Sequence, residues 1–533
     1  MSPESRTDPR RALCDRLAQQ AEVDLVVIGG GATGVAIALD AVARGHRVAL
    51  LEAVDFAKGT SSRATKLLHG GVRYLAQGQI GLVREALRER AVLMANAPHL
   101  AQPLAFVMPA ANILQRALFA TGLRLYDGLA GRRSLGPTRS LSATQLQHCL
   151  PALGPRPGGG VRFWDGQFED ARLALAMART AAHLGALVLN HAPVTQLLMA
   201  QGRVCGVQVR DDETGQAFAL RAACVVNAAG VWVEQVAAQG QQPDPGADAA
   251  GGGVSPSQGV HLVVDREFWP SQEALIVPAS DGRVLFAVPW LGKVLLGTTD
   301  TLRQDRPLEP RPLPSEIDWI LAEIGRSLRR PPTRADIRSQ WAGLRPLVRP
   351  AGHAGAQTQR LSREHTITVA PSGLVGVWGG KWTTCRAMAE DVLAECVRAG
   401  LLDPRGPSHT ARLPLLGAPA TASRSLHQPP AAALYGTEQP LLMALPGADR
   451  WLWRDGDGGL SEAMVRFAVR HEMACTVEDV LARRSRLLFL DAREALRVSP
   501  EVARLLAEER GQPPDMQALA EFQALAAQYA GLS

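Results

Sequence analysis

The chain has 533 residues, which is more than one ordinary hydrophobic core accommodates and predicts two or three domains. Hydrophobic residues make up 46% and charged residues 20% of the sequence, an ordinary globular balance that argues against a chain disordered throughout. The net charge of +6 is spread over a long chain, so it suits an anionic substrate or an anionic membrane surface and gives no support for nucleic-acid binding.

Cysteine spacing and the N-terminus bear on the cellular compartment. The seven cysteines are odd in number, widely separated and never in a Cys-x-x-Cys spacing, which predicts reduced thiols in a cytosolic compartment. The N-terminal extension, residues 1–23, carries Glu4, Asp8 and Asp15 and no apolar core, so neither a secretory signal nor a transit peptide fits it. No stretch reaches the about 18 uninterrupted apolar residues that a spanning helix needs. Any contact with a membrane is therefore expected to be peripheral.

A βαβ unit opens the first predicted domain. Residues 25–28 form an apolar run, residues 34–44 are rich in alanine, and residues 47–51 form a second apolar run. These patterns predict a buried strand, a helix and a second strand, joined by a glycine turn between the first strand and the helix.

The turn of this unit, Gly29-Gly30-Gly31-Ala32-Thr33-Gly34, fits the G-x-G-x-x-G fingerprint in the strand-to-helix context that the fingerprint requires. Gly29 would allow the tight turn, Gly31 would admit a pyrophosphate close to backbone N–H groups, and Gly34 would let helix and strand pack closely. Glu52, at the end of the second strand, would accept hydrogen bonds from ribose hydroxyls. The motif predicts dinucleotide binding; FAD and NAD both fit it, and the acidic Glu52 argues against NADP.

Two long helical stretches are predicted next, at residues 80–94 and 112–133. The second has apolar residues at roughly helical spacing with arginines between them. Such a helix can rest on anionic lipid, and it can equally turn its apolar face to the core, so both interpretations stay open. Its apolar and basic residues are Ile113, Leu114, Leu118, Phe119, Leu125, Leu129, Arg116, Arg124, Arg132 and Arg133.

The middle of the chain is predicted to complete the α/β part around the nucleotide site. A helix at residues 170–184 is followed by short strands near residues 187–190 and 202–209, and the segment 225–230 closes this α/β part. Residues 235–258 are rich in Gln, Ala, Gly and Pro without periodicity, which predicts a solvent loop.

The second half of the chain predicts a sheet and then a helical domain. Strand-like runs at residues 260–264, 285–288 and 293–297 predict an antiparallel sheet in a second, substrate-facing domain. Residues 402–430 shift to Pro, Ala and Ser, as expected of a linker. From Ser461 onward the helix propensity is high, which predicts a C-terminal helical domain.

One segment resembles a known family. Residues 60–75, TSSRATKLLHGGVRYL, resemble the T-S-S-x-x-S-K-L-I-H-G-G-x-R-Y-L segment of the FAD-dependent, quinone-linked glycerol-3-phosphate dehydrogenases. Thr65 stands in place of a serine of this motif, and Val260 precedes His261 where the family usually has serine. The resemblance continues in order through residues 97–100, 170–173, 227–230, 297–300, 344–347, 379–384, 470–474, 478–484 and 490–492.

The resemblance implies the fold class and its division. It implies an α/β fold: a Rossmann-like FAD-binding domain of the glutathione-reductase and D-amino-acid-oxidase type, an antiparallel-sheet substrate domain and a C-terminal α-helical domain. The oxidoreductase unit would span residues 24–401 and the helical domain residues 431–533, with residues 402–430 between them. Within the unit, the FAD-binding parts would be residues 24–100, 165–232 and 365–400, and the substrate domain residues 101–164 and 255–364.

The resemblance also implies FAD as the cofactor and a set of residues around it. Together with the glycine motif, the expected cofactor-binding residues are Gly29, Gly31, Gly34, Glu52, Thr60, Ser61, Ser62, Lys66, His69, Gly70, Gly71, Val194, Ala228, Gly230, Asp300, Gly380, Lys381 and Thr383.

The implied reaction is oxidation of sn-glycerol 3-phosphate to dihydroxyacetone phosphate by hydride transfer to FAD. The substrate is an anion, and by the resemblance Arg73, Tyr74, His261, Arg345 and Lys381 line its side of the flavin. His261 is the first candidate for the base that takes the hydroxyl proton, because a neutral imidazole accepts a proton near neutral pH. In the alternative, Arg345 orients the hydroxyl and water takes the proton. Arg345 and Lys381 would stabilise developing negative charge.

The family's electron acceptor is ubiquinone or a related quinone, which implies a cytoplasmic enzyme held peripherally at the inner membrane, and a homodimer by analogy. An FAD oxidase of the same fold that reduces oxygen, and a non-catalytic flavoprotein that binds a partner through its C-terminal helices, are the alternatives. His69 and His471 lack metal-ligand spacing, so we expect structural histidines and no metal site. Trp451 and Trp453 are expected to pack a core or cap.

Overall fold

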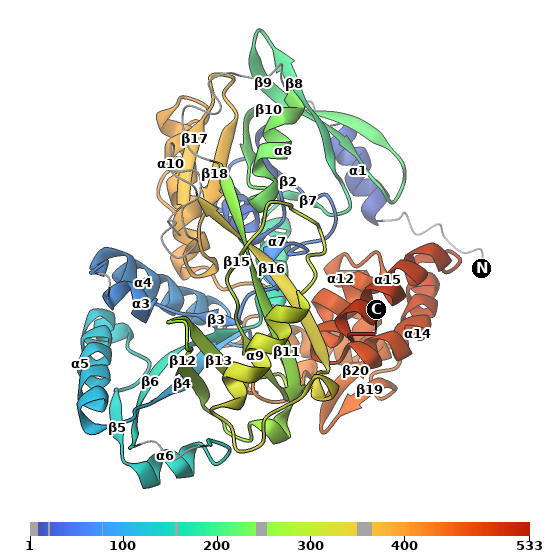
Figure 1. Ribbon diagram of the computed structural model, residues 1–533. Coiled ribbons are helices and arrows are strands. Elements are labelled where there is room, and N and C mark those ends of the chain that lie inside the picture. The colour runs from blue at the N-terminus through green and yellow to red at the C-terminus, as the bar shows by residue number, and fades with distance from the viewer. Residues whose placement is uncertain are drawn as a thin grey trace.

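The computed structural model describes residues 9–19, 22–76, 78–154, 158–240, 253–348 and 365–532. Two large sheets lie side by side, and a helical C-terminal part packs against the second of them (Figure 1). The chain crosses between the two sheets several times, so neither sheet is built from one continuous stretch.

The first sheet is the predicted α/β part. It contains five parallel strands, an antiparallel strand at one edge, and a β-ribbon that continues from one of the parallel strands. Its strands in spatial order are β17 (His365–Val369), β18 (Val375–Gly379), β10 (Ala217–Asn227), β1 (Val23–Ile28), β2 (Val48–Leu51) and β7 (Leu187–Leu189), with β8 (Val194–Ala200) and β9 (Arg203–Arg210) in the ribbon.

Both faces of this sheet are covered. Leu25 and Val27 of β1 face a core that includes α2 (Ala32–Ala43), α7 (Asp170–His183) and α10 (Cys385–Arg398). The alternate residues of β1 face a second core with the β8–β9 ribbon and α1 (Pro9–Gln19). A strand buried on both faces reads as a continuous apolar run, which is the pattern that the sequence shows here.

The second sheet carries the predicted substrate-facing surface. Most of its pairings are antiparallel, and β11 pairs with β16 over ten residue pairs. Its strands are β3 (Leu67–Leu68), β4 (Ala101–Pro109), β5 (Arg139–Leu141), β6 (Gly160–Phe168), β11 (Val254–Asp265), β12 (Ala274–Pro278), β13 (Val284–Trp290), β14 (Lys293–Gly297), β15 (Thr301–Leu302) and β16 (Ser339–Val348).

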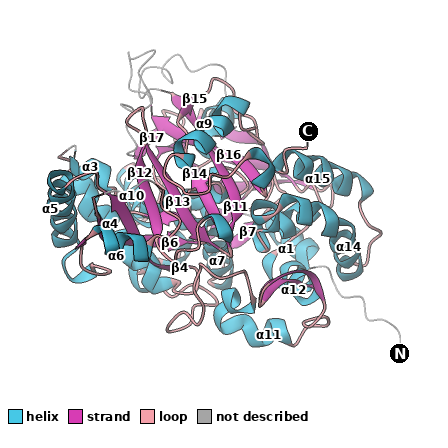
Figure 2. Cartoon of the chain, turned by 60° about the horizontal axis from the view of Figure 1, so that its bottom comes forward, coloured by secondary structure: helices cyan, strands magenta, loops and turns pink. Residues whose placement is uncertain are grey.

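Several helices surround this sheet. Helix α9 (Pro314–Gly325) packs through Ile317, Ile320 and Ile324 into a core with β11, β13 and β14. Helix α5 stands at the edge of the molecule on the side away from the C-terminal helices (Figure 2). The helices of this edge are α3 (Val72–Ala76), α4 (Ile80–Asn96), α5 (Ile113–Ala130) and α6 (Ala143–Cys149).

The prediction of one solvent loop over residues 235–258 is wrong at both ends. A short helix, α8 (Val233–Ala237), and a 3-10 turn, η4 (Ala238–Gly240), occupy its start, and β11 begins at Val254. The early part of β11 contains proline and glycine and has weak strand propensity, so its strand conformation depends on pairing with the distant β16. Residues 241–252 lie outside the described residues.

The C-terminal part consists of helices and one hairpin. Between α12 and α13 the chain makes a single π-helical segment at Asp479–Arg484 (η11), and Met473 and Arg486, both with positive φ, flank it. The elements are η10 (Ala432–Glu438), α11 (Gln439–Met443), β19 (Trp451–Asp455), β20 (Gly458–Ser461), α12 (Glu462–Glu472), α13 (Leu487–Leu490), α14 (Ala492–Arg510) and α15 (Met516–Tyr529).

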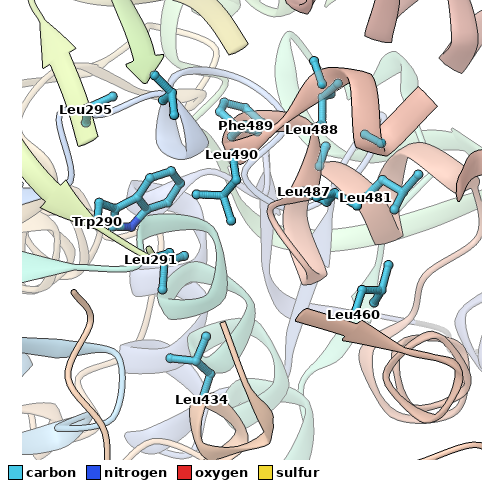
Figure 3. Packing of buried hydrophobic residues seen from close by; sticks show 14 of the residues in the cluster. Trp290, Leu291, Leu295, Leu434, Leu460, Leu481, Leu487, Leu488, Phe489 and Leu490 are labelled. Atoms are coloured by element: carbon cyan, nitrogen blue, oxygen red, sulfur yellow. The ribbon is translucent and has the colours of Figure 1, made fainter. Parts of the chain in front are cut away.

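This C-terminal part shares a core with the second sheet. Trp290 and Leu295 from β13 and β14 lie in one buried apolar cluster with Leu481 and with the helix Leu487–Leu490 (Figure 3). Trp453 joins that core, while Trp451 is 36% exposed. Because this interface is apolar and continuous, the C-terminal part is expected to move with the sheet as one body. In the part of the chain that is described, no helix is long and apolar enough to cross a bilayer.

Candidate functional site

The glycine turn between β1 and α2 has the geometry that its sequence predicts. Gly29 has φ +106°, and a Cβ there would lie 2.8 Å from the carbonyl oxygen of Ala228. A Cβ on Gly34 would lie 1.8 Å from the carbonyl oxygen of Gly29. Ser61 accepts a hydrogen bond at 2.8 Å from the N–H of Ala32, the first residue of α2. The glycines therefore let strand, turn and helix pack closely, and the Ser61 hydroxyl lies at the helix N-terminus, the place where such a unit binds a pyrophosphate.

Glu52 follows β2 and faces the same turn. Its carboxylate accepts from the N–H of Gly30 at 2.5 Å and from the N–H of Val54 at 2.9 Å. Burial raises the pKa of Glu52 above its usual range, while these two backbone donors oppose that rise. An ionised carboxylate has about four acceptor positions, so two contacts leave capacity for ribose hydroxyls.

A cavity of about 560 Å³ lies over the glycine turn and reaches the second sheet. This volume and its largely apolar lining with a few polar groups suit a cofactor together with a small substrate. Fourteen of the residues expected from the sequence line it: Gly29, Gly31, Glu52, Thr60, Ser61, His69, Val194, Ala228, Gly230, His261, Arg345, Gly380, Lys381 and Thr383.

A second group of expected site residues is not part of the cavity lining. Among the described residues, Gly34, Ser62, Lys66, Gly70, Gly71, Tyr74 and Asp300 do not line the cavity. The side chain of Arg73 lies outside the described residues, although its backbone belongs to α3. Their assignment to cofactor or substrate stays a prediction.

Lys66 is an example of an expected site residue that does not line the cavity. Its ammonium group is fully buried and donates to the carbonyl oxygen of Ser62 and to the Asp170 carboxylate, each at 2.7 Å. Burial and the neighbouring Arg486 lower the pKa of Lys66 to about 7. Lys66 thus supports the residues next to the cavity lining through its contacts with Ser62 and Asp170 and does not face the cavity.

The cavity lining also includes residues that the sequence analysis did not select. Lys58, Thr65, Trp232, Leu308 and Trp382 are among them. The Trp382 indole donates to the carbonyl oxygen of Ser61 at 2.9 Å, which ties the C-terminal edge of the first sheet to the loop at residues 60–62. Trp382 lies in the resembling segment 379–384 and Thr65 in the segment 60–75, so position within a motif was the available signal for these two. Trp232 and Leu308 lie outside the segments that resemble the family.

The polar end of the cavity is formed where β11 and β16 pair. Arg345 on β16 donates from Nη1 to the carbonyl oxygen of Thr299 and from Nη2 to the hydroxyl of Thr298, both at 3.1 Å. A Cβ on Gly259 would lie 2.4 Å from Arg345 Nη2, so glycine makes room for this side chain. The Arg345 side chain is 25% exposed, and an oxygen of the Asp300 carboxylate lies 3.9 Å from Arg345 Nη1. Arg345 is thus oriented by the protein and still reaches the cavity.

His261 and Lys381 complete this end. His261 on β11 is buried and stacks on Trp341, with ring centroids 5.6 Å apart. Burial and then the charges of Arg345 and Lys66 hold the pKa of His261 well below its usual range, so the imidazole is neutral near pH 7. The Lys381 ammonium lies 3.8 Å from the centre of the Tyr74 ring. Arg345, Lys381 and the neutral imidazole of His261 thus all line the same cavity, with Arg345 close enough to His261 to influence its pKa.

One group of potential metal ligands occurs away from this cavity within the described residues. The ligand atoms of His191, Cys475 and Asp479 lie within 4.8 Å of one another. Asp479 already accepts from His191 at 2.9 Å and from the backbone N–H of Cys475 at 2.8 Å, and Arg483 contacts its other oxygen at 2.7 Å. These contacts make it an ion-pair network, and we assign no metal to it.

Comparison with known proteins agrees with this geometry. Residues 24–392 match the family described as FAD dependent oxidoreductase, and residues 408–515 match the C-terminal domain of alpha-glycerophosphate oxidase. A mitochondrial glycerol-3-phosphate dehydrogenase of Macaca fascicularis is 38% identical over 545 residues, covering 95% of this chain and 73% of that protein. One of Arabidopsis thaliana is 38% identical, covering 94% of this chain and 86% of that protein.

A solved structure extends this likeness to the fold. The glycerol-3-phosphate dehydrogenase from Bacillus halodurans, complexed with FAD, matches with a TM-score of 0.75 and 29% identity over 98% of both chains. The α/β fold with a C-terminal helical domain is thereby confirmed, and the glycine turn, Glu52 and the cavity above them fit FAD as the cofactor. The chain is an oxidoreductase and belongs to the family of FAD-dependent glycerol-3-phosphate dehydrogenases.

Proposed function

We propose that this chain oxidises sn-glycerol 3-phosphate to dihydroxyacetone phosphate and delivers the electrons to a membrane quinone. The observation that carries the substrate assignment is the polar end of the cavity, where Arg345 lies near the neutral imidazole of His261, in a cavity that Lys381 also lines. A phosphate monoester needs fixed cations, and oxidation of a secondary alcohol needs a group that takes the hydroxyl proton.

Each of these side chains has a distinct part in the proposal. Arg345, held by two threonines, offers planar N–H donors to phosphate oxygens, a geometry that arginine provides better than lysine. Lys381 is a compact charge suited to stabilising the developing alkoxide. His261 is the proton acceptor that we favour, because it stays neutral in this site. Bound FAD supplies the two-electron acceptor for the hydride of C2.

The substrate itself would make His261 a better base. Two cations, Arg345 and Lys66, contribute to lowering the pKa of His261 in the free protein. The phosphate of the substrate carries negative charge that offsets the charge of Arg345, so substrate binding is expected to raise the affinity of the imidazole for a proton. Proton transfer would then be favoured only when the substrate is in place.

The substrate assignment is tested by mixing the purified FAD-loaded protein anaerobically with sn-glycerol 3-phosphate and following the absorbance of oxidised flavin. We expect prompt bleaching, no bleaching with glycerol at equal concentration, and return of the colour on adding a soluble quinone. Colour that persists with the phosphate ester would refute the substrate. Reoxidation by air as fast as by quinone would identify an oxidase.

Helix α5 is the part of the chain that we propose to dock on the membrane. Ile113, Leu114, Leu118 and Leu125 are 69%, 82%, 70% and 55% exposed, although residues of this type usually pack inside. Arg124 on α5 and the 3-10 turn Gly131–Arg133 that follows place exposed guanidinium groups beside these apolar side chains. An apolar stripe edged by cations suits an anionic bilayer surface, where a quinone is also dissolved.

Sedimentation with lipid vesicles tests this surface. The protein is expected to sediment with vesicles that contain an anionic lipid and less with purely zwitterionic vesicles. Leu118→Glu should weaken that binding, whereas Leu441→Glu, at a residue of α11 that is 46% exposed, is the matched control and should not. Equal binding by the two variants would exclude α5 as the membrane surface.

A further inference from the structure

The imidazole of His261 is enclosed on nearly every side. Its relative exposure is 2%, one ring face stacks on Trp341, and a Cβ on Gly297 would lie 2.7 Å from its Cδ2 atom. Among the described residues no group hydrogen-bonds to Nδ1, which is fully covered. The ring therefore cannot swing into the cavity without displacing β14 or Trp341.

Among the described residues, the hydrogen-bond partner of this ring is Thr65. Its hydroxyl lies 2.9 Å from His261 Nε2, and Thr65 itself lines the cavity and is more exposed than the histidine. The hydroxyl thus lies beside the imidazole at the cavity lining, where a substrate in the cavity can reach it. Thr65 replaces the serine of the family motif quoted above, and this departure keeps the hydroxyl.

The backbone around Thr65 is fixed from behind. The N–H of Ala64 donates to Asp170 Oδ2 at 3.1 Å, and the same oxygen accepts from Lys66 Nζ at 2.7 Å. Lys66 has φ +64°, and Leu67 then pairs with β6. Because both neighbours of Thr65 are tied to one buried carboxylate, the direction of its side chain is set by the protein before substrate binds.

A hydroxyl in this position can accept one proton and donate another. The low pKa of His261 keeps the imidazole neutral, with one proton on the ring. In the tautomer with that proton on Nδ1, Nε2 accepts from the Thr65 hydroxyl, and the threonine oxygen keeps lone pairs for a donor in the cavity. The charged groups near this pair are Arg345 on β16 and Lys66, with Asp300 beside the former and Asp170 beside the latter.

We propose that Thr65 receives the C2 hydroxyl proton of the substrate and passes its own proton to His261 Nε2. The inference rests on the proposed function. As the C2–O bond becomes a carbonyl, the substrate O–H bond breaks and a new O–H bond forms on Thr65. The original O–H bond of Thr65 breaks, and an N–H bond forms on His261. The C2 hydrogen leaves with its electron pair as hydride to the bound FAD, which balances the two-electron oxidation.

Thr65→Val removes the hydroxyl and keeps the branched shape, and Thr65→Ser restores the hydroxyl alone. Thr195→Val, at an exposed threonine of β8, is the matched control. The limiting rate of anaerobic flavin reduction should fall by about 100-fold or more in Thr65→Val, the scale of a lost acid–base contribution, while the substrate dissociation constant changes little. Thr65→Ser should recover most of the rate, and the pH dependence of the limiting rate should change only in Thr65→Val.

A measurement without turnover accompanies the kinetics. The ring nitrogens of His261 are observed by NMR in protein labelled with ¹⁵N-histidine, and the Nε2 resonance should shift in Thr65→Val and return toward the wild-type position in Thr65→Ser. If Thr65→Val does not hold flavin, Thr65→Ala and the serine variant carry the same comparison. Reduction of Thr65→Val at the wild-type rate with an unchanged pH profile would overturn the inference. A wild-type protein that the substrate does not reduce would instead refute the proposed function.

Discussion

Replacing Gly34 by alanine should disrupt the nucleotide-binding turn, whereas the same substitution inside an ordinary helix should not. The added Cβ would lie 1.8 Å from the carbonyl oxygen of Gly29, far inside the van der Waals contact distance, and the obstacle is backbone. The turn must therefore move by more than an ångström. Overpacking a closed site costs about 1–3 kcal/mol, and a backbone obstacle places Gly34→Ala at or above about 3 kcal/mol. Because this turn carries the pyrophosphate site, the variant should also lose FAD.

Gly122 provides the matched control within the same protein. It lies in the middle of α5, it is exposed, and a Cβ there meets nothing within 4 Å. Alanine is favoured over glycine in a helix interior by about 0.5–1 kcal/mol, so Gly122→Ala should stabilise the protein slightly. The assay is the FAD content of the purified variants together with their thermal unfolding. A Gly34→Ala protein that retains FAD and unfolds like Gly122→Ala would refute the reasoning from the turn.

Two further substitutions test the electrostatics of the molecule. Arg345→Met should weaken substrate binding by roughly 10- to 150-fold, the worth of a charge-assisted hydrogen bond of about 1.5–3 kcal/mol, and loss of the cation should raise the pKa of His261, visible as a shifted pH profile of flavin reduction. A dissociation constant equal to that of Arg210→Met, at an exposed arginine of β9, would contradict this role. Burial alone would lower the pKa of His191, but Asp479 raises it, so this pair stabilises the fold below a pH of about 6.5 and loses that contribution as the pH rises through the folded-state pKa. Thermal unfolding scans should show wild type losing stability relative to His191→Gln as the pH is raised, and a constant difference would contradict the prediction.

Elements of this fold that depend on local sequence patterns could be predicted from the sequence. The βαβ unit begins and ends within about two residues of the predicted limits, because an apolar run, a glycine turn and an alanine-rich helix are all local signals. The strand predicted at residues 293–297 is observed with the same bounds. The early half of β11 and the hairpin of β19 and β20 were missed, since pairing partners distant in the chain, and turns between glycines, decide their conformation.

The candidate site likewise has parts that local sequence patterns predict and parts that depend on residues distant in the chain. The glycines and Glu52 were selected by spacing, because the βαβ unit that positions them is a local pattern. The contact between Thr65 and His261 joins residues 196 positions apart, and no pattern of spacing reports such a pair. Lys66 and Ser62 were expected at the cofactor by resemblance, which stays a prediction. Both are buried and do not line the cavity, and Asp170 and Arg486 bind them.

Through the contacts of Arg486, the C-terminal helices support residues next to the cavity lining. Arg486, at the start of α13, is 1% exposed and donates from Nη2 to the carbonyl oxygen of Ser62 at 2.8 Å. The same nitrogen contacts Asp170 at 3.2 Å, and Nε lies 2.7 Å from the carboxylate of Glu169. Ser62 ends the 3-10 turn whose Thr60 and Ser61 line the cavity. The C-terminal part is thus joined to the cofactor loop by a buried cation.

Arg486→Met should consequently release FAD although the residue lies outside the cavity lining. Removing one partner of a buried ion pair costs about 3–5 kcal/mol, because the remaining carboxylate, here Glu169, loses its strongest cationic partner in a dry site. Arg504→Met on the exposed face of α14 removes only surface pairs with Glu501 and Glu508, each worth about 0.5 kcal/mol or less. The temperature at which flavin fluorescence is released measures both variants. If Arg486→Met keeps its flavin to the same temperature as Arg504→Met, the C-terminal helices do not hold the cofactor loop.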